Sequence, residues 1–203
     1  MPEEQSFAAI EEALKKAVAA LREADVRFLL AGSLASWARG GPETRHDLDL
    51  VVKPEDAKRA LDALVGAGMK AEDPPEEWLY KAWDGDVLVD LIHSPQGLEV
   101  TDELIERGEE LSVLGIAIRV MSLEDVLTTK LLALDEHSLD YSSLLRIVRA
   151  LREQIDWEAL RKRTHGHPYA KAFFTLVEEL GIADATGAPP TGARVRVVPP
   201  EED

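Results

Sequence analysis

The chain has 203 residues, of which 45% are hydrophobic, a formal net charge of −16 and no cysteine. This length suffices for one domain with a real core, and this apolar content argues against a disordered chain. The lack of cysteine excludes disulfides and thiolate sites, and the negative charge argues against a broad surface for nucleic acid or anionic membranes.

The sequence pattern predicts alternating helices and strands in the first third of the chain. The apolar spacing predicts a helix over 7–24, and a short apolar run predicts a buried strand over 26–30. Gly32 and Ser33 follow that strand, and "LASWAR" predicts a short helix that a Gly-Gly-Pro sequence ends. A further strand is expected over 47–52, where acidic and aliphatic residues alternate before the run becomes aliphatic throughout.

The middle of the chain predicts a helix, a hairpin and a second strand pair. Pro54 favours the start of a helix that ends at Gly66 or Gly68. The strand-like segments "WLYKAW" and "DVLVDLI" flank an Asp-Gly sequence, which is typical of a hairpin turn. We expect a short helix over 100–107 and two short strands around Gly115.

The last 80 residues are mainly helical by pattern. Ser122 predicts a helix N-terminus, with Asp125 three residues later in a near capping box, and two more helices are expected over 140–152 and 168–180. The fold class predicted is α+β (α/β), with a mixed β-sheet flanked by helices and a C-terminal helical part. The expected organisation is a catalytic domain, a helical region and a flexible tail, with the bounds 1–121, 122–182 and 183–203.

Two carboxylates lie one residue apart at the start of the strand over 47–52. Because side chains alternate between the faces of a strand, Asp47 and Asp49 share one face with Val51, and Leu48, Leu50 and Val52 point to the other. Magnesium prefers hard oxygen ligands and usually takes one or two carboxylates together with substrate phosphates. The competing structural interpretation is that both acids are turn residues satisfied by backbone N–H groups.

Three features favour a functional site over the turn interpretation. Gly32 permits a close backbone approach, and the helix after Ser33 offers free N–H groups to a phosphate. Asp90 lies among aliphatic residues of a predicted central strand, where an unpaired carboxylate is costly, so it needs a cation or hydrogen-bond donors. The order of Gly-Ser, acid pair and third acid is more specific than any of its parts.

This order resembles the nucleotidyltransferase superfamily that shares the DNA polymerase β-type palm. The matching segments are "LLAGSLASWARG", "TRHDLDLVV" and "VLVDLI", so the resemblance covers residues 26–93. Farther along, "VMSLEDVLTTKLLAL" and "LDYSSLLRIVRAL" are similar to the small bacterial nucleotidyltransferases and their abortive-infection, toxin–antitoxin branch. Lys130 and Asp140 stand where that branch often carries a helical lysine and a downstream aspartate.

The resemblance implies transfer of a nucleoside monophosphate from an NTP to a hydroxyl acceptor, with release of pyrophosphate. It implies that Asp47, Asp49 and Asp90 hold two magnesium ions and that Asp90 helps to deprotonate the acceptor. The acceptor could be a small molecule, a protein or RNA.

The same resemblance assigns the nucleotide contacts. It implies that Gly32 and Ser33 hold the triphosphate and that Arg45 and Lys130 neutralise phosphate charge. The four tryptophans are expected in the core or on the wall of a cleft, and Trp37, just past the Gly-Ser turn, is the one that could stack on a base.

Other classes of protein share parts of this sequence pattern. The chain could be a non-catalytic binding partner of the same fold, such as an antitoxin-like or regulatory protein, or it could form homo-oligomers. A metal-dependent glycosyltransferase normally builds a longer nucleotide-binding region before its Asp-x-Asp, and the histidines lack regular metal-ligand spacing. No apolar run approaches the ~18–20 residues that span a bilayer, so we expect a cytoplasmic protein without membrane partners.

Overall fold

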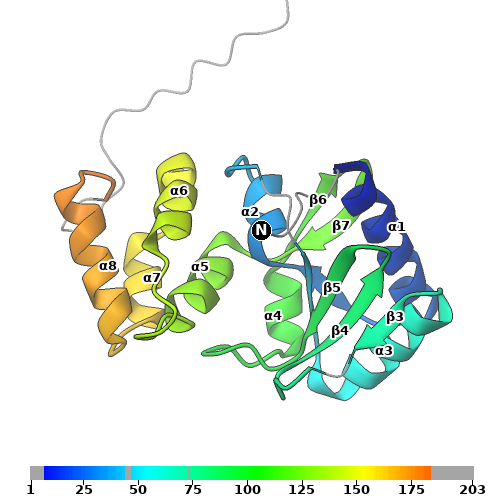
Figure 1. The fold of residues 1–203 in the computed structure, drawn as a ribbon. Coiled ribbons are helices and arrows are strands. Elements are labelled where there is room, and N and C mark those ends of the chain that lie inside the picture. Colours follow the sequence, from blue (N-terminus) through cyan, green and yellow to red (C-terminus); the bar gives the residue numbers. More distant parts are fainter. Residues whose placement is uncertain (1–6, 44–46, 73, 184–203) are drawn as a thin grey trace, which may run out of the picture.

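The computed structural model describes residues 7–43, 47–72 and 74–183. Within them, a seven-stranded mixed sheet is covered by helices, and a group of further helices follows at one end (Figure 1). This is the mixed α/β class that the sequence pattern predicts. Arg45 lies outside the described residues, as do residues 184–203 of the predicted tail.

The sheet has the strand order β3-β4-β5-β2-β1-β7-β6. The strands are β1 (Phe28–Leu30), β2 (Leu48–Val52), β3 (Lys70–Glu72), β4 (Leu79–Asp84), β5 (Val87–Ile92), β6 (Glu109–Val113) and β7 (Ile116–Val120). The central strand β2 runs antiparallel to β1 and parallel to β5. The hairpins β4–β5 and β6–β7 extend the sheet on either side.

Eight α-helices and two 3-10 turns lie within the described residues. They are α1 (Phe7–Glu23), α2 (Gly32–Ala38), η1 (Pro54–Asp56), α3 (Ala57–Gly66), α4 (Asp102–Arg107), α5 (Leu123–Leu132), α6 (Tyr141–Leu151), η2 (Arg152–Gln154), α7 (Trp157–Arg163) and α8 (Pro168–Glu179). Helices α1 and α3 pack against each other and against β5, whereas α2 contacts β2 and α5. Helices α6, α7 and α8 lie beyond α5, away from the sheet (Figure 1).

Buried side chains form two hydrophobic clusters. The sheet cluster joins α1 and α3 to the strands, and its fully buried members include Leu48 and Leu50 of β2. The helical cluster joins α5 to α8 around Trp157 and Phe173. Helix α5 belongs to both, because Val126 packs in the sheet cluster and its neighbours Leu127 and Leu131 pack in the helical one. The division of the chain into domains at residue 121 stays a prediction.

Most predicted elements are present, with shifted ends. Helix α2 begins at Gly32, two residues before "LASWAR", and the helix expected from Pro54 starts as the 3-10 turn η1. The short edge strand β3 and the seven-residue α7 were not predicted. All three residues of β3 are exposed, so no alternation between apolar and polar residues marks it. In the part of the chain that the structure describes, no helix has the length and apolarity to cross a membrane.

Candidate active site

A row of charged side chains crosses the middle of the sheet. In the β2–β5 ladder Asp49 is directly opposite Asp90, and in the β4–β5 ladder Asp90 is directly opposite Lys81. Directly opposed residues point to the same face of a sheet, so these three side chains share one face. The other face at this level carries Leu48 and Leu50, which are fully buried. The alternation that the acid pair predicts is therefore present on β2.

The charges in this row shift the acidity of Asp49. Burial raises the pKa of the Asp49 carboxyl to about 6, and the charges of Asp90 and Asp47 push it in the same direction. The ammonium groups of Lys130 and Lys81 oppose that rise. Asp47, the residue before β2, is close enough to affect both other aspartates. The three predicted acids therefore form one electrostatic group.

Asp90 has a cationic partner within the sheet. The Lys81 ammonium donates a hydrogen bond of 3.2 Å to Asp90 Oδ1, and both side chains are largely buried. Burial raises the pKa of Asp90, Lys81 lowers it by its charge and its hydrogen bond, and Asp47 and Glu76 raise it. Lys81 thus satisfies part of the need for donors that a carboxylate has at this position.

Glycine is required at position 32 by the Asp49 carboxylate. Gly32 has a φ of +61°, and a Cβ built on it would lie 1.8 Å from Asp49 Oδ2. Any larger side chain would collide with that carboxylate in addition to the backbone strain of a left-handed conformation. The Ala31 N–H donates to the Asp49 carbonyl at 2.8 Å, which holds the turn against β2. Ser33 follows within the first turn of α2.

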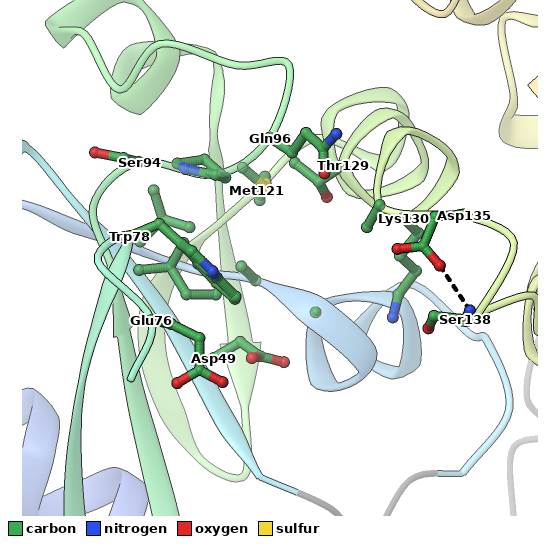
Figure 2. A pocket seen from close by; sticks show the side chains of 16 residues that line it. Asp49, Glu76, Trp78, Ser94, Gln96, Met121, Thr129, Lys130, Asp135 and Ser138 are labelled. Atoms are coloured by element: carbon green, nitrogen blue, oxygen red, sulfur yellow. Dashed lines mark hydrogen bonds between the residues drawn. The ribbon is translucent and has the colours of Figure 1, made fainter. Parts of the chain in front are cut away.

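A pocket of about 890 Å³ opens beside this row. Gly32, Asp49 and Lys130 line it, whereas Ser33, Asp47 and Asp90 are not among its lining residues. Its walls come from β2 and the turn before α2, from the segments ahead of β4 and after β5, and from α5 with the loop that follows (Figure 2).

Lys130 reaches this pocket from α5. Figure 2 shows its side chain directed into the pocket, near Asp135 and Ser138 of the following loop. Its ammonium is in neither a hydrogen bond nor an ion pair with any of the described residues. Asp135 Oδ1 accepts from the backbone N–H groups of His137 and Ser138 at 2.8 and 2.7 Å, which shapes the loop. Lys130 therefore offers its charge to Asp49 and to the pocket.

A buried ion-pair network fixes the start of α5. The Ser122 hydroxyl caps the helix by accepting from the Asp125 N–H, as the capping pattern predicts, and donates to the Asp125 carboxylate at 2.7 Å. That carboxylate is almost fully buried and also pairs with Arg163 of α7 at 2.7 Å and with Arg107 of α4 at 3.3 Å. The network joins the sheet-side α4 to the C-terminal helices through the helix that carries Lys130.

Sequence reasoning missed some residues of the site and placed others differently. Lys81 and Glu76 come into the site through strand pairing and loop packing, which leave no local sequence signal. Trp37 packs edge-on against Phe7, with ring centroids 5.3 Å apart, and is not among the residues that line the pocket. Trp78 lines the pocket instead. Asp140, the aspartate downstream of Lys130, caps α6 by accepting from two backbone N–H groups.

The donor set is suited to a divalent cation that is shared with a substrate. Among the residues described, no group of three or more histidine, aspartate and glutamate side chains is arranged to hold a metal ion alone. Magnesium commonly takes only one or two carboxylates and completes its shell with water and substrate phosphates. The site meets that requirement in the number and chemistry of its ligands, because Asp49 and Asp90 share one sheet face and Asp47 is nearby.

The sequence matches a known protein family. Residues 5–178 match the family described as "Uncharacterised nucleotidyltransferase". No curated protein matches the chain by sequence.

Two solved structures of the antibiotic-resistance factor ANT(2″)-Ia share the fold. The solution structure has a TM-score of 0.59 at 19% identity, over 87% of this chain and 97% of that chain. The crystal structure in complex with adenylyl-2″-tobramycin has a TM-score of 0.58 at 17% identity, over 82% and 97%.

Proposed function

The chain belongs to this nucleotidyltransferase family, and we propose that it moves a nucleoside monophosphate from an NTP to a hydroxyl acceptor in a magnesium-dependent reaction. The observation that carries the proposal is the row of Asp49 and Asp90 on one sheet face, with Asp49 at a pocket that Gly32 and Lys130 also line. A glycine turn, paired carboxylates and an unpaired ammonium are the groups needed to position a metal–triphosphate complex.

Asp47, Asp49 and Asp90 are the proposed metal ligands. Bound divalent cations supply charge neutralisation at the phosphate oxygens and at the attacking and leaving oxygens. The protein's part is to hold Asp49 and Asp90, whose pKa values are both raised, opposite each other on β2 and β5, where a cation offsets their mutual repulsion. The hydrogen bond from Lys81 fixes the orientation of the Asp90 carboxylate.

Gly32, Ser33 and Lys130 are the proposed contacts of the triphosphate. The absence of a side chain at Gly32 leaves its backbone accessible beside Asp49, and Ser33 is the next residue along this turn. The Lys130 ammonium makes no hydrogen bond or ion pair within the described parts of the chain and faces the same pocket, so it is available for phosphate charge. A role of Arg45 in neutralising phosphate stays a prediction from the resemblance.

Transfer proceeds by displacement at the α-phosphorus. The acceptor oxygen forms a bond to the α-phosphorus, the bond from that phosphorus to the bridging oxygen breaks, and pyrophosphate leaves. The hydroxyl proton passes to a carboxylate, for which we propose Asp90, the residue to which the family resemblance gives this role; burial raises the pKa of Asp90 and so makes it a better proton acceptor than an ordinary aspartate.

A small molecule is the acceptor that the pocket suits best. Its volume of about 890 Å³ lies within the usual range for small-ligand pockets of roughly 300–1,000 Å³. The net charge of −16 disfavours an RNA acceptor. The adenylylated tobramycin in the ANT(2″)-Ia crystal structure is an adduct of the same kind.

The test is transfer of a radiolabelled α-phosphate. Each of the NTPs, labelled at the α-phosphate, is incubated with magnesium and the protein, alone and with cell lysate, and labelled products are separated. We expect a magnesium-dependent labelled product that Asp49→Asn and Asp90→Asn each abolish and that Asp62→Asn leaves unchanged. Asp62 is an exposed aspartate of α3, so it controls for the loss of one carboxylate. Unchanged transfer by Asp49→Asn would refute the assignment.

A further inference from the structure

One wall of the pocket is not used by the proposed nucleotide contacts. Gly32, Asp49 and Lys130 lie on the walls formed by the α2 turn, β2 and α5, whereas Glu76 and Trp78 come from the segment just before β4 (Figure 2). An acceptor has to approach the α-phosphate from a side that the triphosphate does not occupy. The Glu76–Trp78 wall is such a side, so the chemical groups that this wall can bind indicate the chemical class of the acceptor.

Trp78 presents a large aromatic side chain at the pocket. Its exposed fraction is 43%, which places it among the few large hydrophobic side chains of the described residues that remain exposed. Figure 2 shows the indole on the pocket wall above Glu76. An exposed indole face binds flat apolar groups and cations. Among the aromatic side chains, the indole of tryptophan attracts cations most strongly.

Glu76 adds an unsatisfied negative charge to the same wall. Its Oε2 atom is buried and has no hydrogen-bond partner among the described residues. Its charge also raises the pKa of Asp90, so it adds to the negative potential around the reacting groups. A buried carboxylate oxygen without a donor is costly, and a ligand that brings a positively charged donor removes that cost.

The combination selects one chemical class of acceptor. A carboxylate and an indole face side by side bind a protonated amine through a charged hydrogen bond and a cation–π contact. An anionic acceptor is repelled by the same groups, and a neutral one can offer Glu76 Oε2 only an uncharged donor, which binds a carboxylate less strongly than an ammonium does. The net charge of −16 further favours the approach of a cation.

We propose that Glu76 and Trp78 form the acceptor site and that the acceptor is a hydroxyl compound carrying a protonated amine. The inference rests on the proposed nucleotidyl transfer for the identity of the reaction. The choice of an amine rests on the Glu76–Trp78 wall, with the net charge of −16 as further support.

The first experiment compares acceptors that differ in charge. Tobramycin, glucosamine and ethanolamine are each tested beside their N-acetylated forms, which keep the hydroxyls and lose the ammonium groups, with radiolabelled NTP and magnesium. We expect label on at least one amine and on none of the acetylated forms. Equal labelling of the amine and acetylated forms, or no labelled amine in a protein that binds NTP with magnesium, would overturn the inference.

The second experiment uses matched variants. Glu76→Gln removes the charge at nearly constant volume, and Glu77→Gln is the control, because Glu77 is exposed and does not line the pocket. We expect Glu76→Gln to raise the acceptor KM by about tenfold and to leave the KM of the magnesium–NTP complex unchanged. We expect Glu77→Gln to change neither. If Glu76→Gln instead weakens magnesium dependence, Glu76 is a metal ligand and the inference is wrong.

A binding measurement separates this inference from the proposed function. Titration calorimetry of tobramycin into the metal-free protein needs no turnover, and we expect binding that Trp78→Phe retains in part and that Trp78→Leu and Glu76→Gln both weaken by about tenfold. Equal binding to wild type and Glu76→Gln would count against the acceptor site. Absence of magnesium-dependent NTP binding by the wild type would refute the proposed function instead.

Discussion

Asp49 is the residue on which the charge balance of the site depends. It is held between a glycine that cannot be enlarged, a second aspartate across the strand ladder and a lysine from α5. Burial raises its pKa from an ordinary value of 3.8 to about 6. Because the folded protein therefore holds this proton more tightly than the unfolded chain, the contribution of Asp49 to stability falls as pH rises from 3.8 through about 6.

The first prediction concerns the stability of the metal-free protein. Asp49→Asn removes the buried charge, so we expect it to raise the free energy of unfolding by about 1–3 kcal/mol at pH 8. The gain should shrink as pH falls below about 6 and be nearly absent at pH 4, where the wild-type carboxyl is largely protonated. Urea unfolding of wild type and Asp49→Asn at several pH values, in the presence of a chelator, measures this difference in unfolding free energy. A gain that does not change with pH would contradict the pKa assignment.

The second prediction isolates the contact between Gly32 and Asp49. Gly32 and Gly85 have nearly the same φ, +61° and +60°, but a Cβ at Gly85 would meet nothing within 4 Å. Gly85→Ala should cost only the strain of a left-handed residue, roughly 1–2 kcal/mol of unfolding free energy, and keep NTP binding. Gly32→Ala should cost more and lose NTP binding, because its Cβ displaces the Asp49 carboxylate. Equal effects of the two substitutions on binding would show that this contact is not needed.

Among the elements, α5 connects the sheet to the C-terminal helices. It packs in both hydrophobic clusters, carries Lys130 on the pocket wall and begins at the buried Asp125 network. Two arginines from α4 and α7 neutralise the Asp125 carboxylate, so the orientation of α5 depends on side chains from both parts of the fold.

The third prediction tests that network. Asp125→Ala leaves two arginines without their shared carboxylate and removes its hydrogen bond with Ser122, so we expect a loss of about 3 kcal/mol in unfolding free energy. Asp62→Ala breaks an exposed i,i+4 pair with Lys58 and should cost less than about 0.5 kcal/mol. Urea unfolding of both variants gives the comparison. A loss for Asp125→Ala as small as that for Asp62→Ala would show that the network contributes little.

Strands and helices with a clear local pattern could be predicted from sequence, and so could the alternation of Asp49 with the buried Leu48 and Leu50 on β2. The prediction that Asp90 joins Asp47 and Asp49 depended on the pairing of β2 with β5, which the register confirms for Asp49. Lys81 and Trp78 could not be assigned, because strand register and loop packing bring them to the site without a local motif. The order of strands in the sheet, with β7 beside β1, depends on contacts between distant segments.

For the whole molecule, the pocket lies between the sheet and α5, the helix that packs in both hydrophobic clusters. Asp49 comes from a strand of the sheet cluster, and Lys130 comes from the helix shared with the helical cluster. The opposing charges that would surround a bound metal–NTP complex therefore come from different parts of the fold. Membership of a nucleotidyltransferase family supports nucleotidyl transfer as the class of reaction.

The most direct test of the central claim is titration calorimetry of each NTP into the protein, with and without magnesium. We predict that the wild type binds at least one NTP only when magnesium is present and that Asp49→Asn loses this binding while Asp62→Asn keeps it. Binding that is independent of magnesium, or equal binding to wild type and Asp49→Asn, would contradict the account.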